Sequence, residues 1–378
     1  MRIALHNIHN LPVNLQFHDY IFELLRQKHI SVFYFSDRSG INYVKTLTRL
    51  IRYKSISNRY NGISLKEIEF VFTVSQLNKK ADVLLNLNLM CFNNIQSDFS
   101  SVIAKFNGIK IFNLGDYFWY RPGSETYKLL QSIGVDHLLG YAMHDRYCSY
   151  FQEHFPKYKG KVWGIPFGYT PRFVATTPFS KRKAKAVALG SVNPLRPLNA
   201  PIINYRETAD FFPDENWFHK FRRELILNKN HLSNEMDSML PEFPLIKDFK
   251  YDLVAKFNEY QMFVTCESIF SFPSAKVFEG MACQTALVCA DLDCNKEYGL
   301  KDGENCIMFK ANSIKDFQNK IKFYQSNLSK LEAIAIEGKR FVMANYSLEK
   351  NAQHIINTTK HIVSHGGKIN ASPIKERI

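Results

Sequence analysis

The sequence predicts an α/β protein with two domains of similar size, each built on a parallel sheet. A chain of 378 residues is long enough for two sizeable cores. Short apolar runs alternate with amphipathic helical patterns in both halves, which is typical of parallel sheets covered by helices on both faces. A segment rich in Pro, Thr and basic residues separates the halves and predicts a hinge at 171–184. We therefore expect a central cleft between the two sheets.

The strands follow from the apolar runs. In the first domain, residues 1–170, the predicted strands are Ile3–Leu5, Ile30–Phe35, Phe70–Val74, Val83–Leu87, Lys110–Asn113 and His137–Gly140, with an amphipathic helix at Tyr20–Gln27. In the second domain, residues 185–344, they are Lys185–Leu189, Met262–Cys266, Ala286–Ala290 and Cys306–Phe309. Residues 366–378 are expected to form a flexible basic tail.

The composition restricts the partners and the compartment. Lys and Arg exceed Asp and Glu by 14 charges, which favours an anionic nucleotide, an anionic glycan, a membrane surface or nucleic acid. The first residues lack the apolar core of a signal peptide, and no apolar run reaches the length of a membrane span. The seven cysteines are scattered without a CxxC pair. A reducing cytoplasm is therefore the expected compartment.

One βαβ unit carries the strongest functional signal. A strand at Met262–Cys266 leads into a helix that opens near Ser274, and a second buried strand follows at Ala286–Ala290. The first turn of such a helix presents free backbone N–H groups and the positive end of its dipole, which suits a phosphate. Lys276 falls in that turn, and Glu279 on the same helix face is placed to accept hydrogen bonds from ribose hydroxyls. The unit predicts a pocket for the diphosphate of a nucleotide sugar.

The segment Phe272–Asp291 of this unit resembles the donor-site signature of group 1 (family 4-like) glycosyltransferases with the GT-B fold, and looks closest to their spore-maturation-type branch. Four further segments are similar to family segments in the same order along the chain. They are Val162–Phe173, which resembles the linker that closes the first domain, Ala186–Arg196, which resembles the strand and glycine loop of the nucleotide domain, Glu297–Asn305, which resembles the loop after the donor strand, and Asn345–Ser347.

The resemblance implies a GT-B architecture, in which two Rossmann-like domains with parallel sheets face a central cleft. Residues 1–170 would then form the acceptor side and residues 185–344 would bind the nucleotide sugar. A helix at 345–365 would cross back to the first domain. The family transfers hexosyl units, and its family 4 members retain the anomeric configuration.

The resemblance also implies roles for single residues in donor binding. Glu279 matches the ribose-binding glutamate of the family. Ser274 and Ala275 match the positions whose backbone amides meet the diphosphate, whereas Gly190 and Arg196 fall where the glycine loop and a basic residue approach the phosphates.

The chain departs from the family pattern at two positions. Family 4 has a second glutamate eight positions before the first, where this chain has Ser271; Glu267 is nearby and could substitute at a different spacing. Gln284 stands where the family has glycine. A left-handed helix stop without glycine costs about 1 kcal/mol, so this turn is expected to be built differently.

No metal cofactor is expected. Asp291-Leu-Asp293 matches a D-x-D metal motif of another glycosyltransferase fold. Here the motif follows a central strand, and the sequence has no other cluster with metal-ligand spacing. The family that the chain resembles uses backbone and polar contacts instead.

Candidate acceptor residues follow the strands of the first domain. Asp116 ends a buried strand at the edge that faces the functional crevice of open α/β sheets. It would be the general base for the acceptor hydroxyl, or it would only cap the following loop. Tyr117 and Trp119 would supply a sugar-stacking wall. His6 and His9 lie at the same rim, where they would contact the acceptor or the donor, or remain surface histidines.

Two further features have alternative interpretations. His144-Asp145 is a second candidate acid–base pair, for which a helix-capping role is favoured. Residues Lys45–Arg59 carry five basic residues and no acid among apolar ones. This pattern predicts a basic amphipathic helix that docks on a membrane or an anionic acceptor, or an ordinary solvated face.

These patterns predict a glycosyltransferase that moves a sugar from a nucleoside-diphosphate donor to a glycan or lipid-linked acceptor, in bacterial surface polysaccharide or lipopolysaccharide synthesis. A sugar-nucleotide epimerase on the same fold would use the same donor pocket, but the basic aromatic first domain argues against it. A non-catalytic nucleic-acid-binding protein would use the positive charge, yet no recognition module supports it. The expected location is the cytoplasm, with a peripheral position on the inner face of the plasma membrane as an option.

Overall fold

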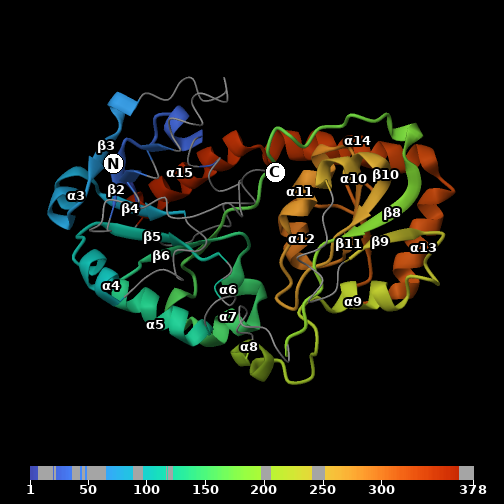
Figure 1. Cartoon of the computed structure of the whole chain (residues 1–378), viewed down its shortest axis with the longest axis horizontal. Helices are drawn as coiled ribbons and strands as arrows, with labels where there is room; N and C mark the ends of the chain where they lie inside the picture. Colours follow the sequence, from blue (N-terminus) through green and yellow to red (C-terminus); the bar gives the residue numbers. More distant parts are fainter. Residues whose placement is uncertain are drawn as a thin grey trace.

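The computed structural model shows two parallel sheets side by side, each covered by helices (Figure 1). The residues that it describes are 1–6, 20, 23–35, 43–44, 47–48, 65–87, 97–115, 117, 122–196, 206–240 and 252–365. Several predictions concern residues outside these ranges, namely those for His9, Asp116, Trp119, most of Lys45–Arg59 and the tail 366–378. None of the helices in these ranges combines the length and apolar character needed to cross a membrane.

In the described ranges, the first sheet has the strand order β3-β2-β1-β4-β5-β6-β7, and every strand pair is parallel. Its strands are β1 (Ile3–His6), β2 (Val32–Tyr34), β3 (Glu69–Val71), β4 (Val83–Asn86), β5 (Ile109–Asn113), β6 (His137–Gly140) and β7 (Val162–Gly164). One face packs on α3 (Val74–Lys80), α4 (Ser97–Ala104), α5 (Gly123–Ile133) and α7 (Ser149–His154). The short helix α6 (His144–Tyr147) follows β6.

The second sheet has the order β12-β11-β10-β8-β9 in the described ranges and is also parallel. Its strands are β8 (Lys183–Leu189), β9 (Met236–Met239), β10 (Tyr260–Val264), β11 (Ala286–Ala290) and β12 (Ile307–Phe309). Helices α9 (Lys220–Leu227) and α13 (Ile314–Gln325) pack on one face, and α10 (Leu253–Glu259) and α11 (Ala275–Ala282) pack on the other. Helix α12 (Asp293–Glu297) follows β11, and α14 (Leu328–Asn345) ends the domain.

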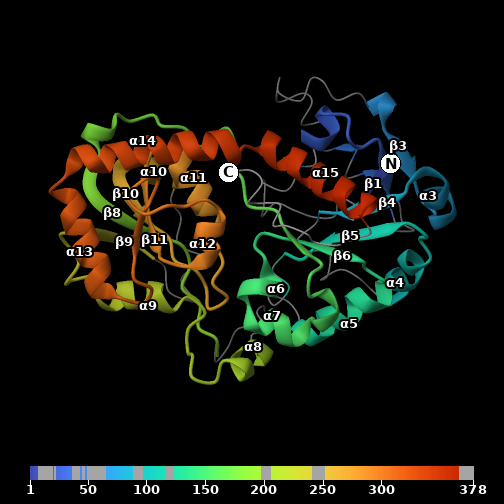
Figure 2. The same ribbon diagram turned by 180° about the vertical axis from the view of Figure 1, so that it is seen from behind.

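Helix α15 (Leu348–Ser364) returns to the first domain, so α14 and α15 together run along both domains (Figures 1 and 2). Its apolar face joins the core of the first sheet beside Leu5 and Leu85. Asn351 donates to Pro166 O at 3.1 Å, and His354 Nε2 lies 3.0 Å from Gly164 O. These contacts fix α15 along β7 and the segment that follows it.

A second connection joins the domains at the opposite edge of the molecule. Helix α8 (Arg206–Phe211) lies between β8 and β9 in the sequence, yet it packs beside α7 of the first domain (Figure 1). The Glu207 carboxylate accepts hydrogen bonds from Ser124 N at 3.0 Å, Ser124 Oγ at 2.6 Å and Tyr150 OH at 3.0 Å. Phe211 extends the same contact with an edge-on packing against Tyr150. The sequence did not predict this crossing.

The structure differs from the sequence prediction at three places in the fold. The strand pairings include β7 and β9, which were not predicted because both are short edge strands without a strong apolar run. Val74 starts α3 instead of ending β3. Gln284 adopts φ 56°, so α11 does stop in a left-handed conformation without glycine. The expectation of a differently built turn was therefore wrong.

Candidate functional site

The carboxyl ends of β8 and β10 form the topological switch point of the second sheet. From β8 the chain continues outward to β9, and from β10 it continues in the opposite direction to β11. Open α/β sheets bind their ligands in the crevice at such a point. One segment bridges the two loops there, because Phe218 N donates to Asn193 O and Ile269 N donates to Phe218 O, both at 2.9 Å. Helix α9 therefore begins between the two strand ends.

Arg222 of α9 lies directly at this switch point. Its side chain is buried, with Nη1 donating to Ser191 O at 2.9 Å and Nη2 donating to Cys266 O at 2.7 Å. Gly190 leaves room for the Arg222 guanidinium, because a Cβ at residue 190 would lie 2.9 Å from Arg222 Nη1. The backbone of Gly190 also has a φ of 127°, which favours glycine. The glycine predicted to approach a phosphate thus makes room for a guanidinium.

Lys276 adds a second cation in the first turn of α11. Burial and the charge of Arg222 lower the pKa of Lys276 to about 8, against the opposing attraction of Glu279. Ser274 shares a 2.8 Å hydrogen bond with Thr265 Oγ1 and makes no side-chain cap on the helix. The free N–H groups of the helix start and two cations therefore surround the same place, which suits an anion.

Glu279 lies one turn further along α11. It is buried at 6 % exposure, although carboxylates are seldom buried without a compensating charge. Lys276 supplies such a charge, since Glu279 raises the pKa of the lysine. The two side chains thus place a cation and an acceptor of hydrogen bonds next to each other, as the sequence predicted.

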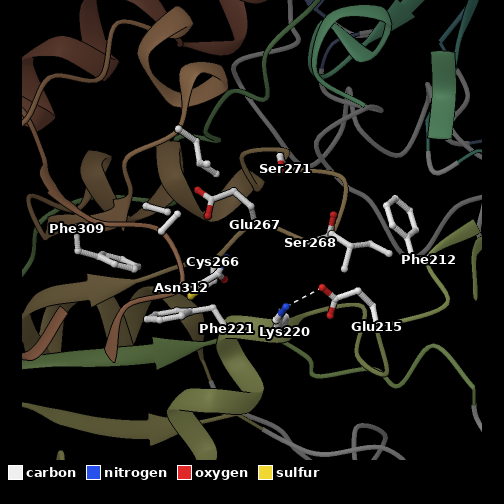
Figure 3. A pocket seen from close by; sticks show the side chains of 14 residues that line it. Phe212, Glu215, Lys220, Phe221, Cys266, Glu267, Ser268, Ser271, Phe309 and Asn312 are labelled. Atoms are coloured by element: carbon white, nitrogen blue, oxygen red, sulfur yellow. Dashed lines mark hydrogen bonds and ion pairs between the residues drawn. The ribbon is translucent and has the colours of Figure 1, made fainter. Parts of the chain in front are cut away.

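A cavity of about 190 Å³ lies beside the loop that follows β10 (Figure 3). Glu267 projects over it from the loop after β10, and its Oε1 accepts a 2.7 Å hydrogen bond from Asn295 Nδ2. Burial raises the pKa of Glu267 to about 7, although Asn295 and Arg222 act in the opposite direction. Lys220 and Glu215 form a 2.7 Å ion pair at the rim. The remaining lining residues include Phe212, Phe221, Ser268, Ser271, Phe309 and Asn312.

The two domains touch above this site. Tyr298 of the second domain donates a hydrogen bond to Tyr141 O of the first. Phe272, three residues before the first residue of α11, packs edge-on against His144 with ring centroids 4.2 Å apart. Arg146 and Glu297 form a 3.1 Å ion pair across the same junction. The loops at the carboxyl ends of both sheets therefore meet beside the start of α11.

The structure uses Arg196 differently from the prediction. Its guanidinium donates to Glu215 O and Ala209 O, both at 2.8 Å, and holds the chain between α8 and α9. In this arrangement Arg222, which the sequence analysis missed, is the arginine at the switch point. Its only sequence signal was a basic residue on the buried face of an amphipathic helix.

The acceptor-side residues that the structure describes are buried. His6 ends β1 at the switch point of the first sheet, and its Nδ1 lies 2.7 Å from Asn86 Nδ2 at the end of β4. Tyr117 is 3 % exposed in an aromatic core with Phe151 and Phe155, so it cannot form a sugar-stacking wall in this conformation. The burial of His6 excludes the alternative of a surface histidine, and the predicted stacking role of Tyr117 was wrong.

His144 and Asp145 do not form an acid–base pair. His144 is fully buried among aromatic rings, and burial lowers the pKa of its imidazole to about 3. Asp145 Oδ2 accepts a 2.9 Å hydrogen bond from Gly160 N and does not cap α6.

Comparisons with solved structures cover almost the entire chain. HepE of Anabaena, in a complex with UDP-glucose, has a TM-score of 0.51 at 11 % identity, covering 95 % of this chain and 99 % of HepE. A glycosyltransferase from Rickettsia africae gives 0.52 at 11 % identity, over 96 % and 99 % of the two chains. Sucrose-phosphate synthase from Thermosynechococcus elongatus gives 0.51 at 12 % identity, over 96 % and 99 %. The fold is GT-B.

In this GT-B fold, residues 247–357 match a family model described as glycosyl transferase-like. The matched range runs from before α10 into α15 and includes Glu267, Lys276 and Glu279. No curated protein sequence matches the chain.

Proposed function

We propose that this chain is a nucleotide-sugar-dependent glycosyltransferase of the group 1, family 4-like type. The observation that carries the proposal is the pair of cations, Arg222 and Lys276, at the switch point beside the buried carboxylate of Glu279. A nucleoside diphosphate presents two negatively charged phosphates next to a ribose. The phosphates would pair with Arg222 and Lys276, and the ribose hydroxyls would donate to Glu279. The match of residues 247–357 to a glycosyl transferase-like model supports the same conclusion, as does the earlier resemblance to the spore-maturation-type branch.

The donor would bind along the carboxyl edge of the second sheet. The diphosphate lies between Arg222 and the start of α11, where Ser274 and Ala275 offer backbone amides, and the ribose hydroxyls lie against Glu279. The transferred sugar then extends into the cavity under Glu267, which stands in for the glutamate missing at Ser271. A hexosyl unit from a UDP-sugar is a suitable candidate, because HepE, of the same fold, was solved with UDP-glucose.

Transfer would proceed by charge stabilisation of the leaving diphosphate. As the glycosidic bond breaks, negative charge develops on the phosphate oxygen, and fixed cations in a water-poor site stabilise it. The contacts of Phe272 with His144 and of Tyr298 with Tyr141 exclude water on the first-domain side. Because the two cations supply the neutralising charge, we propose turnover without a metal, and retention follows from the family resemblance.

The acceptor would bind on the first-domain side of the cleft. We keep Asp116 as the proposed general base for the acceptor hydroxyl. We also propose that His6 and Asn86, at the carboxyl ends of β1 and β4, line the acceptor site. The chain's excess of 14 positive charges favours an acceptor or membrane surface that carries phosphate or carboxylate. A glycan or lipid-linked acceptor in bacterial surface polysaccharide or lipopolysaccharide synthesis fits this chemistry, with the enzyme in the cytoplasm or at the inner membrane face.

Isothermal titration with UDP, GDP and ADP, their common sugars and inorganic pyrophosphate tests the donor site. One nucleoside diphosphate should bind, and its 2′,3′-dideoxy analogue should bind at least about tenfold more weakly, since each lost charge-assisted hydrogen bond is worth about 1.5 kcal/mol or more. In Glu279→Gln that discrimination should disappear, whereas pyrophosphate binding persists. The exposed Glu153→Gln is the matched control.

Failure of every nucleotide to bind the wild type would exclude the donor site. With the nucleotide sugar that binds, release of free sugar in water distinguishes transfer chemistry from the epimerase alternative. An epimerase would instead return the nucleotide sugar as a mixture of epimers.

A further inference from the structure

His219 is a buried histidine at the switch point that the donor site described above does not use. It precedes α9 directly, between the loop that follows β8 and the loop that follows β10. Its side chain is 8 % exposed, and its Nδ1 has no hydrogen-bond partner among the described residues. A buried polar nitrogen without a partner costs free energy, so its position calls for a ligand.

The groups that act on His219 are cationic. Burial, followed by the charges of Arg222 on its own helix and Lys276 on α11, holds the pKa of His219 well below its usual range. The loop after β10 brings Glu267 and the Cys266 thiol to the same place, where the charge of Arg222 lowers the pKa of both against their burial. In the free protein the imidazole is therefore neutral at pH 6.5, beside two positive side chains.

We propose that His219 is a third phosphate-binding side chain, which takes up a proton from solvent when the diphosphate of a nucleotide sugar binds. A diphosphate between Arg222 and Lys276 replaces the repulsion on the imidazole with attraction to two negative phosphates. The proton then resides on a ring nitrogen, and the imidazolium donates a charge-assisted hydrogen bond to a phosphate oxygen. This inference rests on the proposed donor site and adds a coupling between donor binding and pH.

The test is calorimetric titration at pH 6.5 with UDP-glucose, GDP-mannose and ADP-glucose, of which the one that binds is used. Diphosphodiesters of this kind do not titrate near neutral pH, so the ligand contributes no proton. The Lys276 ammonium is already protonated at this pH, because its pKa is about 8. Heats measured in two buffers of different ionisation enthalpy give the number of protons taken up.

We expect wild-type protein to take up close to one proton more than His219→Gln, and to bind about tenfold more tightly. Glu267→Gln should keep this uptake, which separates the imidazole from the other group that titrates near pH 7. The control His231→Gln replaces an exposed histidine and should behave as wild type.

Tight binding by the wild type with no proton uptake at pH 6.5 would overturn the role of His219 and leave the donor site intact, even if His219→Gln fails to fold. Equal uptake by wild type and a folded His219→Gln would overturn it as well. Absence of binding for all three nucleotide sugars would instead overturn the donor site itself.

Discussion

Replacing Lys276 with methionine should make the free protein more stable and donor binding weaker. The reason is that the ammonium is held at the anion site against its own electrostatics. Burial and Arg222 lower the pKa of Lys276 from 10.5 to about 8. Since each pKa unit corresponds to about 1.36 kcal/mol, the charge costs the folded state at most about 3 kcal/mol. The side chain is only partly buried, and we expect a gain of about 1 kcal/mol on removing the charge.

The size of this gain depends on pH. Below pH 8 the native state must protonate a lysine that resists protonation, so Lys276→Met has its full advantage. Above pH 8 the folded lysine loses its proton, whereas the unfolded lysine keeps its proton up to about pH 10.5. The free-energy cost of the buried charge therefore falls over this range, and the advantage of Lys276→Met disappears. Urea denaturation at pH 7 and pH 10 measures the full advantage and most of its loss. The attraction to Glu279 is already included in the pKa of Lys276.

Donor binding should change in the opposite direction. Losing one charge-assisted contact to a phosphate costs about 1.5–3 kcal/mol, so the Kd of the nucleotide sugar should rise about 10- to 100-fold. Lys315→Met, at an exposed position of α13, is the matched control and should change neither quantity. Unchanged affinity in Lys276→Met would refute the anion site, and a loss of stability greater than about 1 kcal/mol would refute the account of the buried charge.

Three further substitutions test the structure around the site. Gly190→Ala should lower the free energy of unfolding by about 1–3 kcal/mol and weaken donor binding. The added Cβ would meet the Arg222 side chain, at a backbone conformation that suits only glycine. Thermal unfolding and calorimetry measure the two effects, and an unchanged melting temperature would contradict the prediction. Gln284→Gly should raise the stability by about 1 kcal/mol in urea denaturation, since glycine removes the cost of φ 56°; a destabilised variant would show that the glutamine side chain compensates. Glu207→Gln should cost about 1–2 kcal/mol. In a double-mutant cycle with Ser124→Ala the two losses should not add, whereas additivity would mean that the hydrogen bond from Ser124 Oγ to Glu207 contributes nothing.

The sequence was sufficient for the centre of the second domain. The β10–α11–β11 unit was predicted almost in full, because two apolar strands flank a helix with a recognisable start, and Lys276 and Glu279 follow from local spacing alone. Strand β9 was missed, since Met236–Met239 is a half-buried edge strand with two polar residues at its centre. Short edge strands lack the apolar run on which such a prediction depends.

Arg222, the other cation of the site, could not be predicted from local pattern. Arg222 precedes Cys266 by 44 residues, and only the folded sheet brings its guanidinium to the carbonyl there. Arg196 was chosen because a basic residue follows the glycine loop, but its side chain is used by nearby carbonyls. The burial of His6 and Tyr117 likewise depends on neighbouring strands and aromatic rings that are distant in sequence.

Helix α15 has a consequence for how the protein is made. The face of the first sheet that carries Leu5, Phe33 and Leu85 is covered by α15, which the ribosome produces only after the whole second domain. At bacterial or eukaryotic elongation speeds this delay lasts roughly 10–30 s. For that interval the nascent first domain exposes an apolar sheet face, and chaperones that bind such surfaces should hold it. Ribosome-arrested chains that end before residue 348 should be cleaved in the first domain by protease, and chains that extend beyond α15 should resist; equal resistance would show that the first domain closes without it.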